Sequence, residues 1–326
     1  MTAPIPVVIC DDSNLARKQM ARALKHWNVN ITFAENGLVA LENIRAGKGD
    51  VMFLDLNMPV LDGYETLEKI RAEDLPTMVI VVSGDIQPEA KEKILSLGAL
   101  DFIQKPFDES TVSEVLRRFG LLSELSGSKE ADVPEDSSVS LPDYYQEVAN
   151  VSMGRAGDKL ARYLNAFVHL PVPVVANITR NELQKKFRKG AKNKTHMVSQ
   201  GFVGYGIAGE AILSLPDDAF APLSKLLHID YSGSIDLQDE ILMEVGNILI
   251  GSMLRTFAQQ LDIEFSCGVP AVLPGIRHLP GKSDSWKKTL SICIDYGLCD
   301  GAVNCELMLV FSEDSLDALT KLGSYI

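Results

Sequence analysis

The sequence is poor in cysteine, with five in 326 residues and no two of them at CxxC spacing. They are Cys10, Cys267, Cys293, Cys299 and Cys305. Cys10 lies in an apolar run, and none of the others forms a recognisable pair. We therefore expect reduced thiols, as in a protein of the cytoplasm.

Positive charge is also scarce, because 31 Lys and Arg oppose 44 Asp and Glu, for a net charge of −13. The chain has no Lys/Arg-rich run. Binding to a nucleic-acid backbone or to an anionic membrane surface needs such positive charge. We expect neither partner.

Long apolar runs and clustered histidines are missing as well. No window of about 18 uninterrupted apolar residues is present, so we expect no membrane span. The first basic residue is Arg17, which leaves no basic start for a signal peptide. The histidines are scattered without the spacing of metal ligands.

What the chain does have is a balance of 46% apolar and 23% charged residues, typical of a globular protein with a real core. Its length suits two or three domains. Residues 1–120 alternate short apolar runs, such as 5–10, 51–54 and 78–82, with helical patterns at 14–27 and 63–72. This alternation predicts a doubly wound α/β domain with a parallel sheet.

Residues 121–140 are rich in serine and acidic residues, with a single lysine, and we expect a solvated linker there. Residues 141–326 are expected to form the second domain. Long helices are predicted over 142–165 and 237–261, a strand pair within 201–215, and further strands near 264–272, 290–294 and 303–311.

The second domain carries one spaced pattern twice. Asp143 is followed by Glu147, Asn150 and Pro173, and 97 positions later Glu240 is followed by Glu244, Asn247 and Pro270. Each Glu–Asn pair is three residues apart, so both side chains project from one helix face. The repetition predicts an α+β fold with an internal pseudo-two-fold repeat.

Five polar residues of the first domain each follow, or end, a predicted strand: Asp11, Asp12, Asp55, Ser83 and Lys105. In a doubly wound sheet the carboxyl ends of the strands meet at one edge, so these residues should converge. Three clustered carboxylates favour a hard cation such as Mg²⁺. The Asp55 carboxylate can attack a phosphoryl donor, with Lys105 and the Ser83 hydroxyl contacting the phosphoryl oxygens.

Residues 1–120 closely resemble the CheY-like receiver domain of response regulators, which implies a five-stranded parallel sheet. The residues that carry the resemblance are Asp11-Asp12, Asp55 within the run Leu54 to Pro59, Asp62-Gly63, Ser83-Gly84 and Lys105-Pro106. The resemblance implies that a histidine kinase phosphorylates Asp55. It also implies Mg²⁺ held by Asp12, Asp55 and the Asn57 carbonyl, with Asp11 completing the acidic cluster.

The resemblance also implies that two residues, Ser83 and Phe102, act as a switch. Phe102 matches the aromatic switch position of the family and, with Ser83, would couple phosphorylation to a movement of one face of the sheet. Receivers often dimerise through the face next to this aromatic residue, so a homodimer is one option. The family often has the Lys105–Pro106 peptide in cis.

The repeated Glu–Asn pairs suit hydrolysis of an aspartyl phosphate. An asparagine amide can hold a water in line with the phosphorus atom. The glutamate can form a salt bridge with the active-site lysine of a receiver. The plainer alternative is a pair of soluble helix faces, but asparagine is a poor residue for a helix interior and occurs twice in matched register.

Residues 141–315 resemble the chemotaxis phosphatases CheC, CheX and FliY. The family pattern is Asp or Ser, three residues, Glu, two residues, Asn, then 22 residues to Pro, and the first copy matches it throughout. The second departs at Glu240, where the family has Asp or Ser. Two intact Glu–Asn pairs favour CheC, and the resemblance implies that Glu147, Asn150, Glu244 and Asn247 are catalytic.

Together these features predict a cytoplasmic chemotaxis or two-component signalling protein with a receiver and a phosphatase. The substrate would be a phosphorylated response regulator, with a separate regulator slightly favoured over the chain's own Asp55. The linker would allow the latter. The alternative is a non-enzymatic module that docks a signalling partner under control of Asp55 phosphorylation. The sequence names neither the kinase nor the target.

Overall fold

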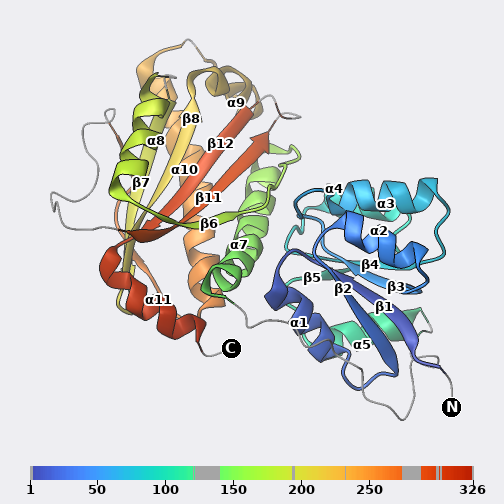
Figure 1. The fold of residues 1–326 in the computed structure, drawn as a ribbon. Helices are drawn as coiled ribbons and strands as arrows, with labels where there is room; N and C mark the ends of the chain where they lie inside the picture. The colour runs from blue at the N-terminus through green and yellow to red at the C-terminus, as the bar shows by residue number, and fades with distance from the viewer. Residues whose placement is uncertain are drawn as a thin grey trace. The chain divides into compact units, whose positions relative to one another are not determined.

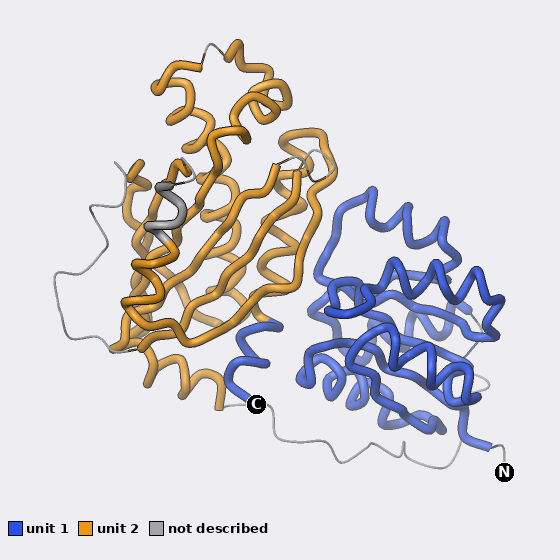
Figure 2. Tube along the Cα trace, turned by 45° about the horizontal axis from the view of Figure 1, so that its top comes forward, with its two compact units in different colours: residues 1–147 blue, residues 148–326 orange. Residues whose placement is uncertain are grey.

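The computed structural model describes residues 3–119, 121, 140–192, 195–231, 233–273, 288–298, 301 and 303–324. The chain divides into two compact units, residues 1–147 and 148–326, which are coloured blue and orange in Figure 2. The predicted linker over 121–140 lies outside the described residues except at its two ends.

The first unit is built on a five-stranded parallel sheet with strand order β2-β1-β3-β4-β5. The strands are β1 (Ile5–Cys10), β2 (Val29–Ala34), β3 (Val51–Leu54), β4 (Met78–Ser83) and β5 (Asp101–Gln104). The helices between and after them are α1 (Asn14–Ala23), α2 (Gly37–Arg45), α3 (Gly63–Ala72), α4 (Pro88–Ser96) and α5 (Glu109–Arg118). The predicted doubly wound α/β fold and its five-stranded parallel sheet are confirmed.

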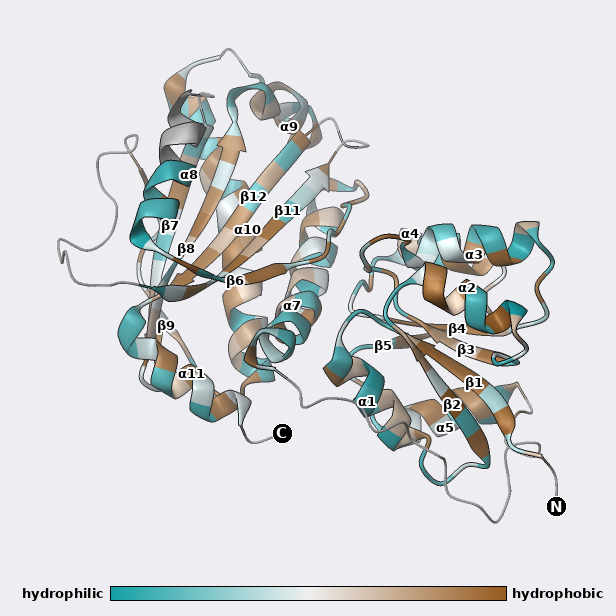
Figure 3. Ribbon diagram, in the orientation of Figure 1, coloured by the Kyte–Doolittle hydropathy of each residue, from teal (hydrophilic) through white to brown (hydrophobic). Residues whose placement is uncertain are grey.

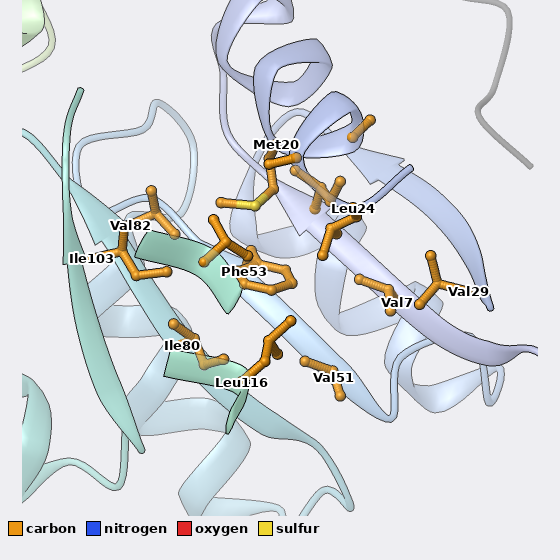
Figure 4. Packing of buried hydrophobic residues seen from close by; sticks show 14 of the residues in the cluster. Val7, Met20, Leu24, Val29, Val51, Phe53, Ile80, Val82, Ile103 and Leu116 are labelled. Atoms are coloured by element: carbon orange, nitrogen blue, oxygen red, sulfur yellow. The ribbon is translucent and has the colours of Figure 1, made fainter. Parts of the chain in front are cut away.

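Helices cover both faces of this sheet (Figure 1). Helices α1 and α5 pack on one face, around a core that contains Phe53, Met20 and Leu116 (Figure 4). Helices α2, α3 and α4 pack on the other face. The strands are mostly hydrophobic because both faces are covered (Figure 3).

Polar side chains cap four of the helices α1 to α5, whereas α4 begins with Pro88 and has no side-chain cap. Ser13, Asn36 and Asp108 each accept a hydrogen bond from a backbone N–H in the first turn, and Asp62 forms a capping box with Glu65. These caps fix where each chain segment turns from a strand into a helix, next to the carboxyl edge of the sheet.

Helix α1 ends at Ala23, four residues before the predicted end at Trp27. The backbone N–H of Trp27 bonds to Leu24 in a turn, and the chain then enters β2 at Val29. Pairing with β1 decides this boundary, and the helical pattern of the sequence does not contain that information.

The second unit contains an antiparallel sheet with strand order β10-β7-β8-β12-β11-β6, and β9 pairs with β7. The strands are β6 (Val174–Ile178), β7 (Thr195–Gly204), β8 (Ile207–Pro216), β9 (Ser266–Cys267), β10 (Ala271–Val272), β11 (Thr289–Leu298) and β12 (Val303–Phe311). The helices are α7 (Leu141–Leu164), which begins in the first unit, α8 (Arg180–Lys192), α9 (Phe220–Leu226), α10 (Ile235–Gln260) and α11 (Leu316–Gly323).

Helices α8 and α10 lie on opposite faces of this sheet (Figure 1). Leu183 of α8 packs with Met197 of β7, whereas a Cβ on Gly246 of α10 would come within 2.8 Å of the neighbouring Val198. Successive strand residues point to opposite faces, so the two contacts define two layers around the sheet.

Helices α7 and α10 pack side by side in antiparallel orientation. The Ser252 hydroxyl of α10 donates to the backbone carbonyl of Arg155 in α7, and the Tyr163 hydroxyl donates to Glu244. The residue number in the contacts increases along α7, from Arg155 to Tyr163, while it decreases along α10, from Ser252 to Glu244. Arg155 and Ser252 are also 97 positions apart, which is the spacing of the sequence repeat.

Two predicted strand segments differ in detail from the structure. The expected strand pair within 201–215 starts earlier, at Thr195, and turns at Tyr205 and Gly206, which both have positive φ. The expected strand over 264–272 is split into β9 and β10. Pro270 lies in the gap and has no N–H for the ladder.

One helix, α10, is long and apolar enough to cross a membrane by length and composition alone. Its most apolar window is 67% buried within the fold, as in a core helix. The burial follows from its contacts with the sheet and with the neighbouring helix α7.

Candidate functional site

Lys105 lies at the carboxyl edge of the parallel sheet, after the outer strand β5. Its side chain is buried at 2% exposure. Its Nζ lies 2.6 Å from Asp11 Oδ2 and 3.0 Å from Asp55 Oδ1. Asp11 follows β1 and Asp55 follows β3, so the predicted convergence of strand ends brings these three charges into contact.

The acidic residues form a compact oxygen cluster. Asp11, Asp12 and Asp55 each offer a carboxylate oxygen, and these oxygens lie within 4.8 Å of one another. A single lysine does not balance three carboxylates. This set of hard oxygen donors fits Mg²⁺, which favours carboxylates and retained waters.

Burial is the main cause of the pKa shifts of the carboxylates in this cluster, and the neighbouring charges modify them. Burial, followed by the charges of Asp11 and Asp55, raises the pKa of Asp12 to about 8. Burial also raises the pKa of Asp55 to about 6, although Lys105 opposes this shift. Burial lowers the pKa of Lys105, but Asp11 and Asp55 outweigh it and hold the pKa well above its usual value. A bound cation would relieve this repulsion.

Backbone groups hold the carboxylates in position. The Asn57 N–H donates to Asp55 Oδ2 at 2.9 Å, and the Ser13 N–H donates to Asp11 Oδ1 at 2.9 Å. The start of α3 approaches closely, because a Cβ on Gly63 would lie 2.4 Å from the Asp55 carbonyl oxygen. Glycine is needed at this point, next to the backbone of the acceptor aspartate.

Ser83 and Phe102 occupy the neighbouring strands β4 and β5. The Ser83 hydroxyl is buried at the end of β4 and accepts a hydrogen bond of 3.1 Å from the Asp85 N–H. Phe102 is partly buried and packs against the core on the α2, α3 and α4 face. The Lys105–Pro106 peptide is cis, as in the resembling family.

The last residues of the first unit, in the first turns of α7, also reach this cluster. Glu147 lies with its carboxylate 3.4 Å from Lys105 Nζ, and Gln146 Nε2 donates to Asp12 Oδ2 at 2.8 Å. Burial raises the pKa of Glu147 to about 7, and the Lys105 charge opposes that shift. Glu147 was among the predicted residues, whereas Gln146 carried no motif signal.

Arg17 is a second contact that the sequence did not indicate. Its guanidinium donates to the Asp11 carbonyl at 2.6 Å and to the Asp12 carbonyl at 3.3 Å. The spacing of five to six residues from a strand end onto α1 is compatible with such a contact, but it is too common to identify one. Arg17 supports the backbone beneath the carboxylates.

The other predicted residues belong to the second unit. Asn150 follows Glu147 by one turn of α7, and Glu244 and Asn247 are one turn apart on α10. Asn247 is exposed and Glu244 is partly exposed. Each Glu–Asn pair therefore has the helical spacing that the sequence predicts.

Three further positions of the repeated pattern, Asp143, Pro173 and Pro270, have structural roles. The Asp143 carboxylate accepts a hydrogen bond from the Ser140 N–H at 3.2 Å, and the Ser140 hydroxyl accepts one from the Asp143 N–H at 3.3 Å. This reciprocal pair caps the start of α7. Pro173 and Pro270 directly precede β6 and β10, so both end the connection to a strand.

Comparison with known proteins identifies residues 7–117 with the response regulator receiver domain family. A two-component response regulator of Oryza sativa, ORR41, is 32% identical over 121 residues, which are 36% of this chain and 95% of that protein. The hybrid signal transduction histidine kinase E of Dictyostelium discoideum is 31% identical over 119 residues, or 35% of this chain. The chain spans only 7% of that kinase, whose further activities are its own.

Two solved structures are also similar. The receiver domain of NarL from Mycobacterium tuberculosis is 34% identical, with 36% of this chain and 96% of that one covered and a TM-score of 0.34. FliY from Thermotoga maritima is 17% identical, with 58% of this chain and 98% of that one covered and a TM-score of 0.47. At these TM-scores neither likeness bears on activity.

Proposed function

The chain belongs to the response regulator family, and we propose that it joins a phosphoacceptor receiver to an aspartyl-phosphate phosphatase of the CheC, CheX and FliY type. The receiver covers residues 1–120 and the phosphatase residues 141–326, joined by an acidic linker. The observation that carries the phosphatase assignment is the pair of Glu–Asn couples, one helical turn apart on α7 and on α10.

Asp55 is the proposed phosphoacceptor. Its carboxylate attacks the phosphorus of a phosphohistidine on a histidine kinase, so that a P–O bond forms and the P–N bond breaks. Lys105, 3.0 Å from Asp55 Oδ1, is placed to contact the transferred phosphoryl group. The Ser83 hydroxyl is the proposed second donor and, with Phe102, reports the phosphorylated state.

Mg²⁺ is the proposed cofactor of this site. Asp11, Asp12 and Asp55 would hold it, together with the main-chain carbonyl of Asn57. Bound Mg²⁺ neutralises negative charge on the carboxylates and the phosphoryl oxygens. Burial raises the pKa values of Asp12 and Asp55, so a cation bound beside them would favour their ionised forms.

Asn150 and Asn247 are the proposed catalytic residues for removing the phosphoryl group. The amide holds a water in line with the phosphorus; water attacks, the bond to the carboxylate oxygen breaks, and inorganic phosphate leaves. Glu147 and Glu244 pair with the receiver lysine and align the helix. The 3.4 Å contact of Glu147 with Lys105 in the first unit supports this role, because it joins the expected partners.

An internal two-fold repeat is part of the proposal. Arg155 and Ser252 occupy equivalent positions and contact each other, as residues near a two-fold axis must. Both repeats also place a proline directly before a strand. The repeat would give the domain two independent phosphatase sites.

The substrate is a phosphorylated receiver, either the chain's own or that of a separate response regulator. The Glu147–Lys105 contact supports action on the chain's own Asp55. The exposed Asn247 supports action on a separate regulator, as a second site open to solvent. With either substrate, the proposed role is in cytoplasmic chemotaxis or two-component signalling.

The test begins with labelling. Incubation with a small phosphodonor and Mg²⁺ should phosphorylate the wild type and leave Asp55→Asn unlabelled. Persistent labelling of Asp55→Asn at another residue would refute the receiver assignment.

The phosphatase is tested with the Asp55→Asn protein and a separate phosphorylated CheY-like regulator. The Asp55→Asn protein should accelerate phosphate release, and adding Asn150→Ala and Asn247→Ala should remove the acceleration. Unchanged decay with both proteins would favour a non-enzymatic docking module instead.

A further inference from the structure

The second Glu–Asn pair has a contact that its sequence motif does not contain. Tyr163, in the last turn of α7, donates its hydroxyl proton to Glu244 Oε1 on α10. Both residues belong to the second unit, where the two helices lie side by side (Figure 1). Tyr163 is 52% exposed, so the hydrogen bond lies at the surface beside the exposed Asn247.

We propose that Tyr163 is a positioning residue for the second phosphatase site, which is therefore built from α7 and α10 together. The inference rests on the proposed function and adds a residue and a second helix to one of its sites. Its substrate is a phosphorylated receiver on a separate chain, because this pair faces solvent.

Glu244 is a partly exposed glutamate on the surface of α10. A surface carboxylate on a long side chain samples many rotamers and loses that freedom when it pairs with a lysine. The phenol holds one oxygen of Glu244 before any partner arrives. The other oxygen stays available to the lysine ammonium of a docking receiver, so the pairing is preorganised.

The hydrogen bond also favours the phenol over other donors at this position. The hydrogen bond to the Glu244 carboxylate raises the pKa of the Tyr163 phenol. The phenol therefore keeps its proton and remains a donor throughout the neutral range. A tyrosine ring is rigid beyond two torsions, which suits a residue that must fix its neighbour.

The two phosphatase sites differ at this point. The residue 97 positions after Tyr163 is Gln260, at the end of α10. The repeat therefore has the amide of Gln260 at the position equivalent to the phenol of Tyr163. Because Tyr163 contacts Glu244, a substitution of Tyr163 should affect the activity of the second Glu–Asn pair and leave that of the first unchanged. The first pair therefore serves as an internal control.

The experiment measures phosphate release from a separate phosphorylated CheY-like regulator in two full-length backgrounds, both also carrying Asp55→Asn. Asn150→Ala leaves the second pair to act alone, and Asn247→Ala leaves the first. Tyr163→Phe removes only the hydroxyl. In the Asn150→Ala background we expect KM to rise about ten-fold with kcat changed less than about two-fold, the effect of losing one hydrogen bond to a charged group.

In the Asn247→Ala background the same substitution should leave KM and kcat unchanged. A third background, Asn150→Ala with Glu244→Gln, tests whether the hydroxyl acts through the carboxylate. There Tyr163→Phe should change neither parameter further, as a double-mutant cycle requires for coupled residues. Thermal unfolding of each variant checks that the helices remain folded.

Three results separate the possibilities. An unchanged KM for Tyr163→Phe in the Asn150→Ala background, with activity otherwise present, overturns the role of Tyr163 and leaves the phosphatase standing. An equal loss in both backgrounds assigns Tyr163 to general packing of the helix pair and also overturns the role. Basal decay with every protein, including the one with both pairs intact, overturns the proposed function and this inference together.

Discussion

The acidic cluster predicts that one substitution at the active site makes the metal-free protein more stable. Asp12 has a pKa of about 8 in the folded protein against 3.8 as its ordinary value, chiefly because of burial and then because of Asp11 and Asp55. The ionised form is therefore penalised by folding. The penalty is absent below about pH 4, grows as the pH rises and is complete near pH 8.

The size of the effect follows from the shift. Each pH unit between the ordinary pKa of 3.8 and the solution pH adds about 1.4 kcal/mol to the penalty. At pH 7 the penalty on the free energy of folding is therefore about 4 kcal/mol at most. Asp12 is partly exposed, and solvent screening reduces this to about 2 kcal/mol. Asp12→Asn keeps the shape of the side chain and removes the charge. We expect its free energy of unfolding to be greater by about 2 kcal/mol at pH 7 in the presence of a chelator.

Mg²⁺ should reduce or reverse the difference in stability between the two proteins. A ligand present at 100 times its dissociation constant stabilises the folded state by about 2.7 kcal/mol. The wild type has the full carboxylate set and gains this, whereas Asp12→Asn binds Mg²⁺ weakly and gains less. The difference in stability should therefore shrink or change sign at saturating Mg²⁺.

Urea unfolding followed by Trp27 fluorescence measures this, in a Trp286→Phe background so that the signal reports the first unit. Trp27 packs against the core of that unit. Asp50→Asn, which removes an exposed carboxylate from the same unit, is the matched control and should change little. The reasoning is refuted if Asp12→Asn is no more stable than the wild type in chelator, or if its gain does not fall as the pH is lowered to 4.

Two further predictions concern close packing and thiol burial. Gly63→Ala places a Cβ against backbone atoms of the phosphoacceptor, so it should destabilise the first unit by about 1–3 kcal/mol and reduce phosphodonor labelling. Gly251→Ala on α10 adds a Cβ that meets nothing within 4 Å, so it should stabilise its unit by up to about 1 kcal/mol. Urea unfolding and labelling measure both variants, and equal effects would contradict the difference in packing. Native protein treated with a thiol reagent should react at the exposed Cys267 before the buried Cys10 and Cys305, because burial raises the pKa of Cys305 to about 12 and that of Cys10 well above its usual value. Mass mapping that finds either buried thiol modified as fast as Cys267 would contradict their burial.

The acidic site was predictable because a parallel sheet imposes its geometry on the sequence. Asp11, Asp55 and Lys105 each stand directly after a strand, and parallel strands end at one edge. Apolar runs locate such strands without any tertiary information. The convergence of these residues within 3.0 Å of Lys105 Nζ follows from topology alone.

Contacts between separate elements could not be predicted in the same way. Gln146, Arg17 and Tyr163 are ordinary polar residues on helices, and nothing in their spacing distinguishes them from surface positions. Their partners are set by how each helix packs. The register of α7 against α10 is such a case, since a shift of one residue would move Tyr163 away from Glu244.

If the Glu–Asn pairs remove phosphate from an aspartate, the protein must accelerate the loss of phosphate from a separate phosphorylated receiver, and this acceleration must depend on the two asparagines. A separate CheY-like regulator is phosphorylated, and its decay is followed with the Asp55→Asn protein and with Asp55→Asn carrying Asn150→Ala and Asn247→Ala. We predict that the first accelerates decay and that the asparagine substitutions lower the accelerated rate on the order of 100-fold, toward the regulator's own rate. Identical decay with the two proteins would contradict the account.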